Sequence, residues 1–301
     1  MTSIALTPPD LAIDADPAPP PGRRLKIGGP EHKTLFCRTL LDTFNPYKPT
    51  VIDWPELDDA TRERVTSLPI WDIAVQTEGR AGKNVSTYAA FIKDPLLRRA
   101  VELNAFEEQR HKVVLSNLVE AYGIKLSPEP EYVIPKDPEW AFMVTGFSEC
   151  IDSFFAFGLF EVARRSGFFP EELVDTFEPV IHEEGRHILF FVNWMAWHRR
   201  HMPWWRRPWF ELKVAAVWLF LAYERMGIAR DVGNGRQDNN FTVSGASSVA
   251  NDVDVAELMD ACLAENERRL GVYDARLLRP TFVPSLVRLA RRFIGKRRST
   301  A

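Results

Sequence analysis

The chain has 301 residues, a formal net charge of −3 and three cysteines, Cys37, Cys150 and Cys262. This length allows one large domain or two ordinary ones, and the small net charge excludes a general attraction to polyanions, so any basic surface must be local. The cysteines stand far apart without paired spacing, which predicts a reducing compartment and excludes a disulfide framework or a cysteine-based zinc site.

The N-terminal part of the chain is rich in proline and aspartate and lacks a basic start followed by an apolar run. We therefore expect residues 1–30 to form a disordered tail rather than a signal peptide, followed by a lead-in segment over residues 31–64. The longest apolar run, Val214 to Tyr223, has about half of the roughly 20 residues that a bilayer span needs. The expected location is cytoplasmic, with a peripheral position on the inner face of the membrane as the alternative.

Helix signals dominate the rest of the chain, and alternating strand patterns are scarce. Prolines and acidic residues at helix starts, with glycine or proline beyond the ends, predict four long helices. Their expected ranges are about 70–92, 95–123, 138–167 and 170–202. Short turns within each pair and one longer crossover between the pairs predict a four-helix bundle over residues 65–202.

The remaining residues, 203–301, are expected to form a C-terminal helical extension. A segment rich in arginine and tryptophan leads into an apolar helix at about 209–229, and a loop rich in glycine, serine and asparagine follows it. Two further helices are expected near 253–271 and 284–296. The predicted fold is therefore all-α: a four-helix bundle with additional C-terminal helices.

The sequence Glu-Glu-x-Arg-His occurs on the second long helix and again on the fourth. Residues three apart share a helix face, so Glu108 projects with His111 and Glu184 with His187, on stripes that are otherwise mostly apolar. A carboxylate buried there without a partner would cost several kcal/mol, and a bound cation is the simplest compensation. Carboxylate and imidazole without thiolate favour iron or manganese over structural zinc.

Helix geometry predicts two more ligands. In an antiparallel helical hairpin, residues equally far from the turn lie at the same height. Counting back across the turn from Glu108 leads to Glu78, and counting back from Glu184 leads to Glu149. The competing Glu161 would lie at the wrong height. One carboxylate from each first helix and a Glu-x-x-His pair from each second helix are what a carboxylate-bridged pair of metal ions requires.

With these motifs the chain resembles the ferritin-like di-iron carboxylate superfamily. The resemblance covers about residues 65–202 and is carried by the segments "VQTEGR", "FEEQRH", "FSECID" and "HEEGRH". It implies a ferritin-like four-helix bundle that holds two iron ions, as Fe/Fe or as Mn/Fe, and reacts with O₂. The implied metal ligands are Glu78, Glu108, His111, Glu149, Glu184 and His187.

The Glu-Glu-x-Arg-His form is similar to the Asp-Glu-x-Arg-His of bacterial multicomponent monooxygenases. This likeness implies that Glu107 and Glu183 accept hydrogen bonds from the ligand imidazoles, and that Arg110 and Arg186 hold these carboxylates by charge-assisted bonds. Here the acid is one methylene longer than in that family. The alternative interpretation places both glutamates on the surface, paired with nearby arginines.

The function that the resemblance implies is an O₂-dependent oxidase or monooxygenase that carries out hydroxylation, desaturation or N-oxygenation. Two electrons would come from outside, through a ferredoxin or a flavoprotein reductase, because no flavin or nicotinamide fingerprint is present. A hydrophobic organic substrate is favoured by small residues within a turn or two of the predicted ligand on the third helix, which could leave an apolar pocket. These small residues are Thr145, Gly146, Ser153 and Ala156. Simple core packing is the alternative.

Two stretches raise the question of a macromolecular partner. Tryptophans and arginines alternate between Trp194 and Lys213, and the stretch from Ser285 to Thr300 has six basic residues and no acid. This composition is typical of an interfacial anchor on an anionic membrane surface, although the helices could simply cap the bundle. The same basic residues would suit RNA, as in a tRNA-modifying di-iron hydroxylase, but nucleic acid is the less favoured partner.

Two other classes of protein share such a metal site. A non-catalytic ferroxidase or metal-binding protein would use the same ligands without an organic substrate. A radical-generating subunit would need a tyrosine beside the metals, and neither Tyr88 nor Tyr122 can be placed there from the sequence. A homodimer is a candidate assembly in each case.

Overall fold

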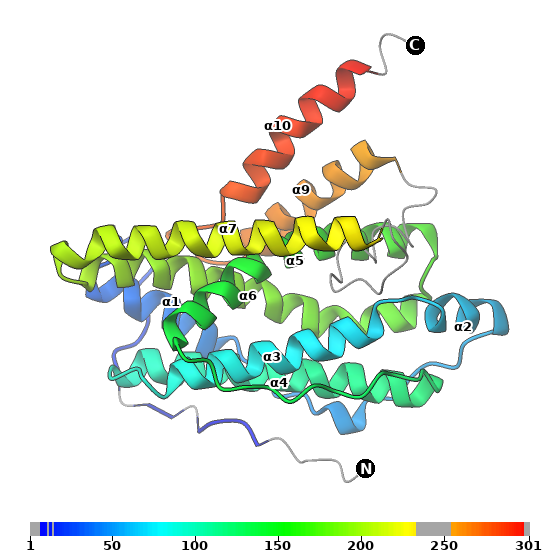
Figure 1. Cartoon of the computed structure of the whole chain (residues 1–301). Helices are drawn as coiled ribbons and strands as arrows, with labels where there is room; N and C mark the ends of the chain where they lie inside the picture. Colours follow the sequence, from blue (N-terminus) through cyan, green and yellow to red (C-terminus); the bar gives the residue numbers. More distant parts are fainter. Residues whose placement is uncertain (1–6, 11, 14, 233–253, 298–301) are drawn as a thin grey trace.

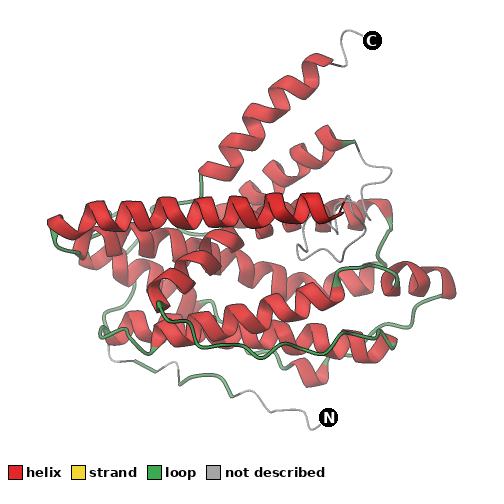
Figure 2. Ribbon diagram, in the orientation of Figure 1, coloured by secondary structure: helices red, strands yellow, loops and turns green. Residues whose placement is uncertain are grey.

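The computed structural model describes residues 7–10, 12, 13, 15–232 and 254–297, and its regular structure within these ranges is entirely helical (Figure 1, Figure 2). The all-α class is therefore confirmed. The helices are α1 (Pro30–Asp42), α2 (Asp59–Thr66), α3 (Trp71–Ala89), α4 (Pro95–Tyr122), α5 (Pro138–Ser166), α6 (Glu171–His201), α7 (Arg207–Val232), α9 (Val255–Gly271) and α10 (Phe282–Arg297), with short 3-10 helices η1 (Pro49–Val51) and η2 (Trp204–Arg206).

The long helices α3 to α6 match the four predicted ones because local signals fix their ends. The side chain of Asp94 accepts a hydrogen bond from the Leu97 N–H at the start of α4, and Asp137 caps α5 in the same way. Gly123 and Gly167 end α4 and α5 with φ of 69° and 67°, a left-handed conformation that favours glycine. Only the end of α3 is displaced, since this helix stops at Ala89.

These helices pack in two hairpins. α3 lies along α4, α5 lies along α6, and α3 also contacts α5 (Figure 1). The core between them is aromatic, with Phe142, Phe157, Phe191 and Trp194 fully buried. This arrangement places the middle of each of the four helices next to the same buried space.

The lead-in segment contains two helices that the sequence did not predict, α1 and α2. The apolar side of α1, with Leu35, Phe36 and Leu40, is buried against α4 and α6. The described residues between 15 and 29 form no helix, and Arg38 donates hydrogen bonds to the carbonyls of Ala15 and Asp16. The disorder expected for residues 1–30 stays a prediction.

The C-terminal extension covers the outer side of α5. α9 packs so closely on α5 that a Cβ added at Gly158 would lie 2.7 Å from the backbone nitrogen of Cys262. α7 runs along α5, and α10 leaves the body beside it (Figure 1). α5 is long and apolar enough to cross a membrane by length and composition, but half of that stretch is buried inside the protein, as expected for a core helix.

Candidate metal centre

The structure brings the six predicted ligands together at the middle of the bundle. Glu78 of α3, Glu108 and His111 of α4, and Glu184 of α6 form one group that could hold a metal ion. A second group consists of Glu108, Glu149 of α5 and His187 of α6, and within each group the ligand atoms lie within 4.8 Å of one another. Because Glu108 belongs to both groups, the two candidate sites share a carboxylate.

Glu161, the competing carboxylate of α5, belongs to neither group, as its position along the helix predicted. The Glu161 carboxylate lies away from both groups and receives hydrogen bonds from Arg164 at 2.8 Å and from Arg165 at 2.5 Å. The arginines lower the pKa of Glu161, with burial acting in the opposite direction. Glu161 is thus a structural carboxylate near the end of α5.

Both histidines turn Nδ1 toward the carboxylates. His111 Nδ1 lies 3.2 Å from Glu184 and 3.6 Å from Glu78, and His187 Nδ1 lies 2.8 Å from Glu108. Both Nδ1 atoms are buried and form no hydrogen bond with a described residue. A neutral imidazole that donates through Nε2 carries a lone pair on Nδ1, and this lone pair would face carboxylate oxygens. Such an arrangement requires a cation or a proton between them.

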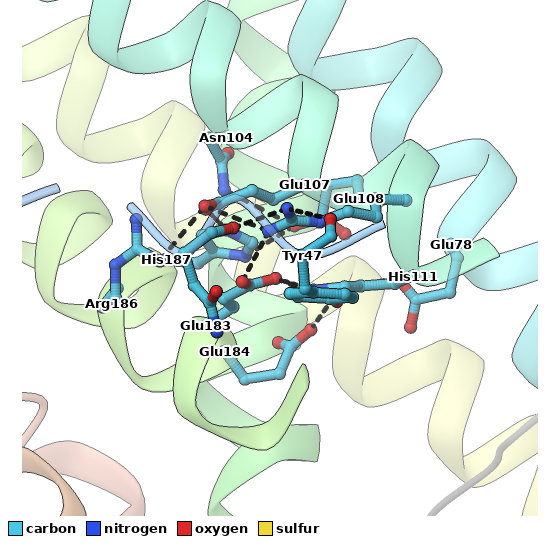
Figure 3. A network of polar contacts seen from close by, with 12 residues as sticks. Tyr47, Glu78, Asn104, Glu107, Glu108, His111, Glu183, Glu184, Arg186 and His187 are labelled. Carbon is cyan, nitrogen blue, oxygen red and sulfur yellow. Dashed lines mark hydrogen bonds and ion pairs between the residues drawn. The ribbon is translucent and has the colours of Figure 1, made fainter. Parts of the chain in front are cut away.

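The Nε2 atoms of the two histidines contact acids of the opposite helix (Figure 3). His111 Nε2 on α4 lies 2.8 Å from Glu183 on α6, and His187 Nε2 on α6 lies 2.9 Å from Glu107 on α4. Both glutamates are fully buried, so the surface placement of these residues is wrong. The crossed pairing fixes each ring with Nε2–H as the donor and leaves Nδ1 free for a metal.

Two buried arginines balance the charges of these glutamates. Arg110 approaches Glu183 to 2.5 Å and Glu107 to 3.6 Å, and Arg186 lies 3.1 Å from Glu107. The lead-in segment orients both guanidinium groups. Arg110 donates to the Asn45 carbonyl at 2.7 Å, and Arg186 donates to a carbonyl of α1 at 2.7 Å.

With Glu107 and Glu183 neutralised in this way, the charge of the ligand set itself is left for protons or metal ions to balance. Four carboxylates and two neutral imidazoles carry a charge that two divalent cations would cancel. Burial raises the pKa of Glu78 to about 8, with the nearby His111 imidazole lowering it and the Glu108 carboxylate raising it further. Burial and the carboxylates of Glu108 and Glu184 raise the pKa of Glu149 well above its usual range. The donor set therefore fits a pair of cations.

Three side chains of the site were missed by the sequence reasoning. The Ser153 hydroxyl donates to Glu184 at 3.0 Å, Asn104 donates to Glu108 at 3.4 Å, and the Tyr47 hydroxyl donates to Glu183 at 3.4 Å. Ser153 and Asn104 each lie four residues, about one helix turn, from a predicted ligand on the same helix, a signal that the sequence contained. Tyr47 belongs to the irregular part of the lead-in segment, and no local pattern indicates its position.

Tyr88 and Tyr122 contact residues outside the two candidate metal groups. Tyr88 stacks on Phe142 with ring centroids 4.5 Å apart, and the Tyr122 hydroxyl donates to the Pro55 carbonyl. Tyr47, whose ring lies 3.9 Å from the Arg110 guanidinium, is the tyrosine that reaches the buried network. Burial raises its pKa to about 12, so the phenol stays protonated at neutral pH.

The pocket expected beside Glu149 is largely filled. Gly146 provides room for the ring of Phe191, which a Cβ at this position would strike. The Ser153 hydroxyl is engaged with Glu184, and the Thr145 hydroxyl accepts a hydrogen bond from Asn84 at 3.2 Å. These small residues serve packing and hydrogen bonding, which is the alternative that the sequence left open.

Comparisons of the chain with protein-family models, with curated proteins and with solved structures found no match. The buried Glu/His cluster is compatible with a di-metal site on the geometry of its own residues.

Proposed function

We propose that the protein is an O₂-dependent di-iron oxidase or monooxygenase of the ferritin-like type that acts on a hydrophobic organic substrate. One observation carries the proposal. Two buried histidines each donate through Nε2 to a glutamate and point an unpartnered Nδ1 atom toward the carboxylates of one candidate metal group. The two groups have Glu108 in common. Oxygen and imidazole donors without thiolate suit iron or manganese, so the pair is Fe/Fe, with Mn/Fe as the alternative.

The bound ions would supply the chemistry of O₂ binding and reduction. The protein residues would hold the ions in two adjacent places. Glu108 would bind both ions. One oxygen of Glu184 faces His111, and the second accepts a hydrogen bond from the Ser153 hydroxyl. Glu149 forms no hydrogen bond with a described residue, so its carboxylate would be free to change its mode of binding as the charge of the centre changes.

The surroundings of Glu149 support an apolar substrate. Phe147, two residues earlier on α5, contacts the ring of Phe191 on α6 at 4.9 Å and that of Trp218 on α7 at 4.9 Å. These aromatic side chains would exclude water from this part of the bundle, the environment that an apolar substrate requires. Electrons would come from a ferredoxin or a flavoprotein reductase in the cytoplasm.

The test is anaerobic loading with Fe(II), followed by metal analysis and exposure to O₂ with an electron donor. Wild-type protein is expected to hold two iron atoms per chain and to oxidise a co-purified or added apolar compound. Glu149→Ala should lower the iron content, whereas Glu161→Ala on the same helix should not.

Three outcomes would overturn the proposal or change its class. Absence of tight iron binding would remove the metal centre altogether. O₂ consumption that yields ferric mineral and no organic product would identify a ferroxidase, and oxidation of bound tRNA would identify an RNA hydroxylase.

A further inference from the structure

The outer face of α7 exposes only uncharged side chains over five turns. Between residues 208 and 226 the exposed residues, which we call the α7 face, are Pro208, Trp209, Leu212, Ala215, Ala216, Leu219, Phe220, Ala222, Tyr223 and Met226. Trp209, Leu219 and Tyr223 are 72%, 72% and 73% exposed. At the rise of an α-helix this face is about 25 Å long. Contiguous apolar surface of this extent marks an interaction site.

The α7 face is held rigidly outward. Phe210, Val217 and Leu221 bury the opposite side of the helix in the core. Glu211, Lys213 and Arg225 of α7 point toward neighbouring helices and fasten α7 to them. They form the ion pairs Glu211–Arg199 at 2.6 Å, Lys213–Glu139 at 2.8 Å and Arg225–Asp152 at 2.7 Å.

Tryptophan and arginine border the α7 face at its N-terminal end. Trp204 and Trp205 are exposed in the turn before α7, next to the exposed Arg206 and Arg207. Among the described residues Arg206 has no acidic partner. Tryptophan with arginine beside an apolar helix face is the composition of a membrane–water interface.

The second border is α10, which starts beside α7 with the ring of Phe282 4.7 Å from that of Trp218 (Figure 1). Its exposed apolar residues are Phe282, Leu286, Leu289 and Phe293. Residues 282–298 contain six basic residues and no acid. Arg288 and Arg292 are exposed, and neither has an acidic partner within the described ranges. An apolar stripe flanked by unpaired arginines makes α10 amphipathic, as is typical of a helix that lies at a membrane surface.

The charges select one partner. In a two-fold contact with a second copy, the same face meets itself, and because the α7 face exposes no acidic residue, the second copy would not pair with the arginines at its border. RNA requires polar contacts to phosphates and bases, which the α7 face does not offer. An anionic lipid surface suits both the apolar face and the arginines, because apolar side chains insert at the boundary of the acyl chains while arginines bind the headgroups. We propose that α7 and α10 form a lipid-binding surface that places the protein on an anionic membrane.

The experiment is flotation of the full-length protein with phosphatidylcholine vesicles, with and without phosphatidylglycerol, at low and high salt. Wild-type protein should float with the anionic vesicles and less with the neutral ones, and high salt should weaken binding. Leu219→Glu should reduce binding by about tenfold or more. The single variants Arg288→Glu and Arg292→Glu should each reduce vesicle binding by at least about fivefold, and only with anionic vesicles.

A matched control is Phe91→Glu, which places the same charge on another exposed apolar residue, 68% exposed just beyond α3. This variant should bind like wild type, and circular dichroism should show unchanged helix content in every variant. Flotation needs no metal, so a protein without iron still tests the surface, and a protein that ignores vesicles can still hold iron.

Wild-type protein that does not float with anionic vesicles would overturn the proposal, as would equal losses in Leu219→Glu and Phe91→Glu. A dimer that Leu219→Glu dissociates, without vesicle binding, would identify a second copy as the partner. Salt-sensitive RNA binding in place of vesicle binding would identify a nucleic-acid surface.

Discussion

Glu107 on α4 accepts a hydrogen bond from His187 on α6, with the two atoms 2.9 Å apart, although His111 lies on the glutamate's own helix. Glu183 and His111 form the reciprocal pair at 2.8 Å. Each helix therefore fixes the ring orientation of the histidine on the other helix. Because the four side chains connect α4 with α6, displacement of one helix relative to the other would disturb both candidate metal sites.

The crossed pairs predict which residues are coupled in metal binding. Glu107→Gln removes the charge behind His187 and should weaken metal binding by about 10- to 100-fold. In anaerobic metal titrations, its effect should largely disappear when His187→Ala is already present and should persist in a His111→Ala background. Glu102→Ala, on the outer side of α4, serves as the control. Equal coupling of Glu107 to both histidines would contradict the crossed arrangement.

A second prediction concerns the buried charge of Arg110. Arg110→Met removes the guanidinium partner of the Glu183 carboxylate, which stays buried. The substitution should lower the free energy of unfolding by about 3–5 kcal/mol. The matched surface variant is Arg99→Met, which removes a partly exposed ion pair with Glu102 at 3.4 Å and should cost about 1 kcal/mol or less. Urea unfolding of the metal-free proteins measures both values. Similar losses in the two variants would mean that the buried pair has no special role.

The four long helices and the clustering of the six candidate ligands were predictable because the signals for them are local. Asp94 and Asp137 cap their own helices, and the heights of Glu78 and Glu149 follow from the helix rise and the position of a turn. No knowledge of tertiary packing is needed for these steps.

The partners of the buried glutamates depend on packing instead. Whether Glu107 meets His111 or His187 is decided by how α4 and α6 are rotated toward each other. The positions of Tyr47 and of α1 depend on contacts with residues far away in the sequence, such as the hydrogen bond from Arg110 to the Asn45 carbonyl. The prediction of a pocket at Gly146 was wrong because the sequence does not show that the ring of Phe191 fills this space.

The packing of Phe191 against Gly146 leads to a third prediction. Gly146→Ala would place a methyl group in the ring of Phe191 and should lower the free energy of unfolding by about 1–3 kcal/mol through overpacking. Gly271→Ala is the matched control, because a Cβ there meets nothing within 4 Å, and it should be neutral or stabilising by up to about 1 kcal/mol. If both variants were equally stable in urea, an open pocket at Gly146 would be the better description.

The last prediction concerns pH and the contact of α5 with α6 and α7. The hydrogen bond from His198 lowers the pKa of Glu139 to about 2, with burial opposing and Lys213 adding to this shift. Because the folded pKa lies below the ordinary 4.5, the ionised carboxylate stabilises the folded state above pH 4.5. This contribution disappears as the pH falls from 4.5 toward 2. Glu139→Gln should therefore lower the free energy of unfolding by about 2 kcal/mol at neutral pH.

The difference between Glu139→Gln and wild type should narrow as urea unfolding is repeated at lower pH. Wild-type protein should lose stability over the acidic range more steeply than the variant, since only the wild type takes up the proton of Glu139 on unfolding. A constant difference at every pH would show that the amide disturbs packing and that the contacts of Glu139 with His198 and Lys213, both at 2.8 Å, contribute little.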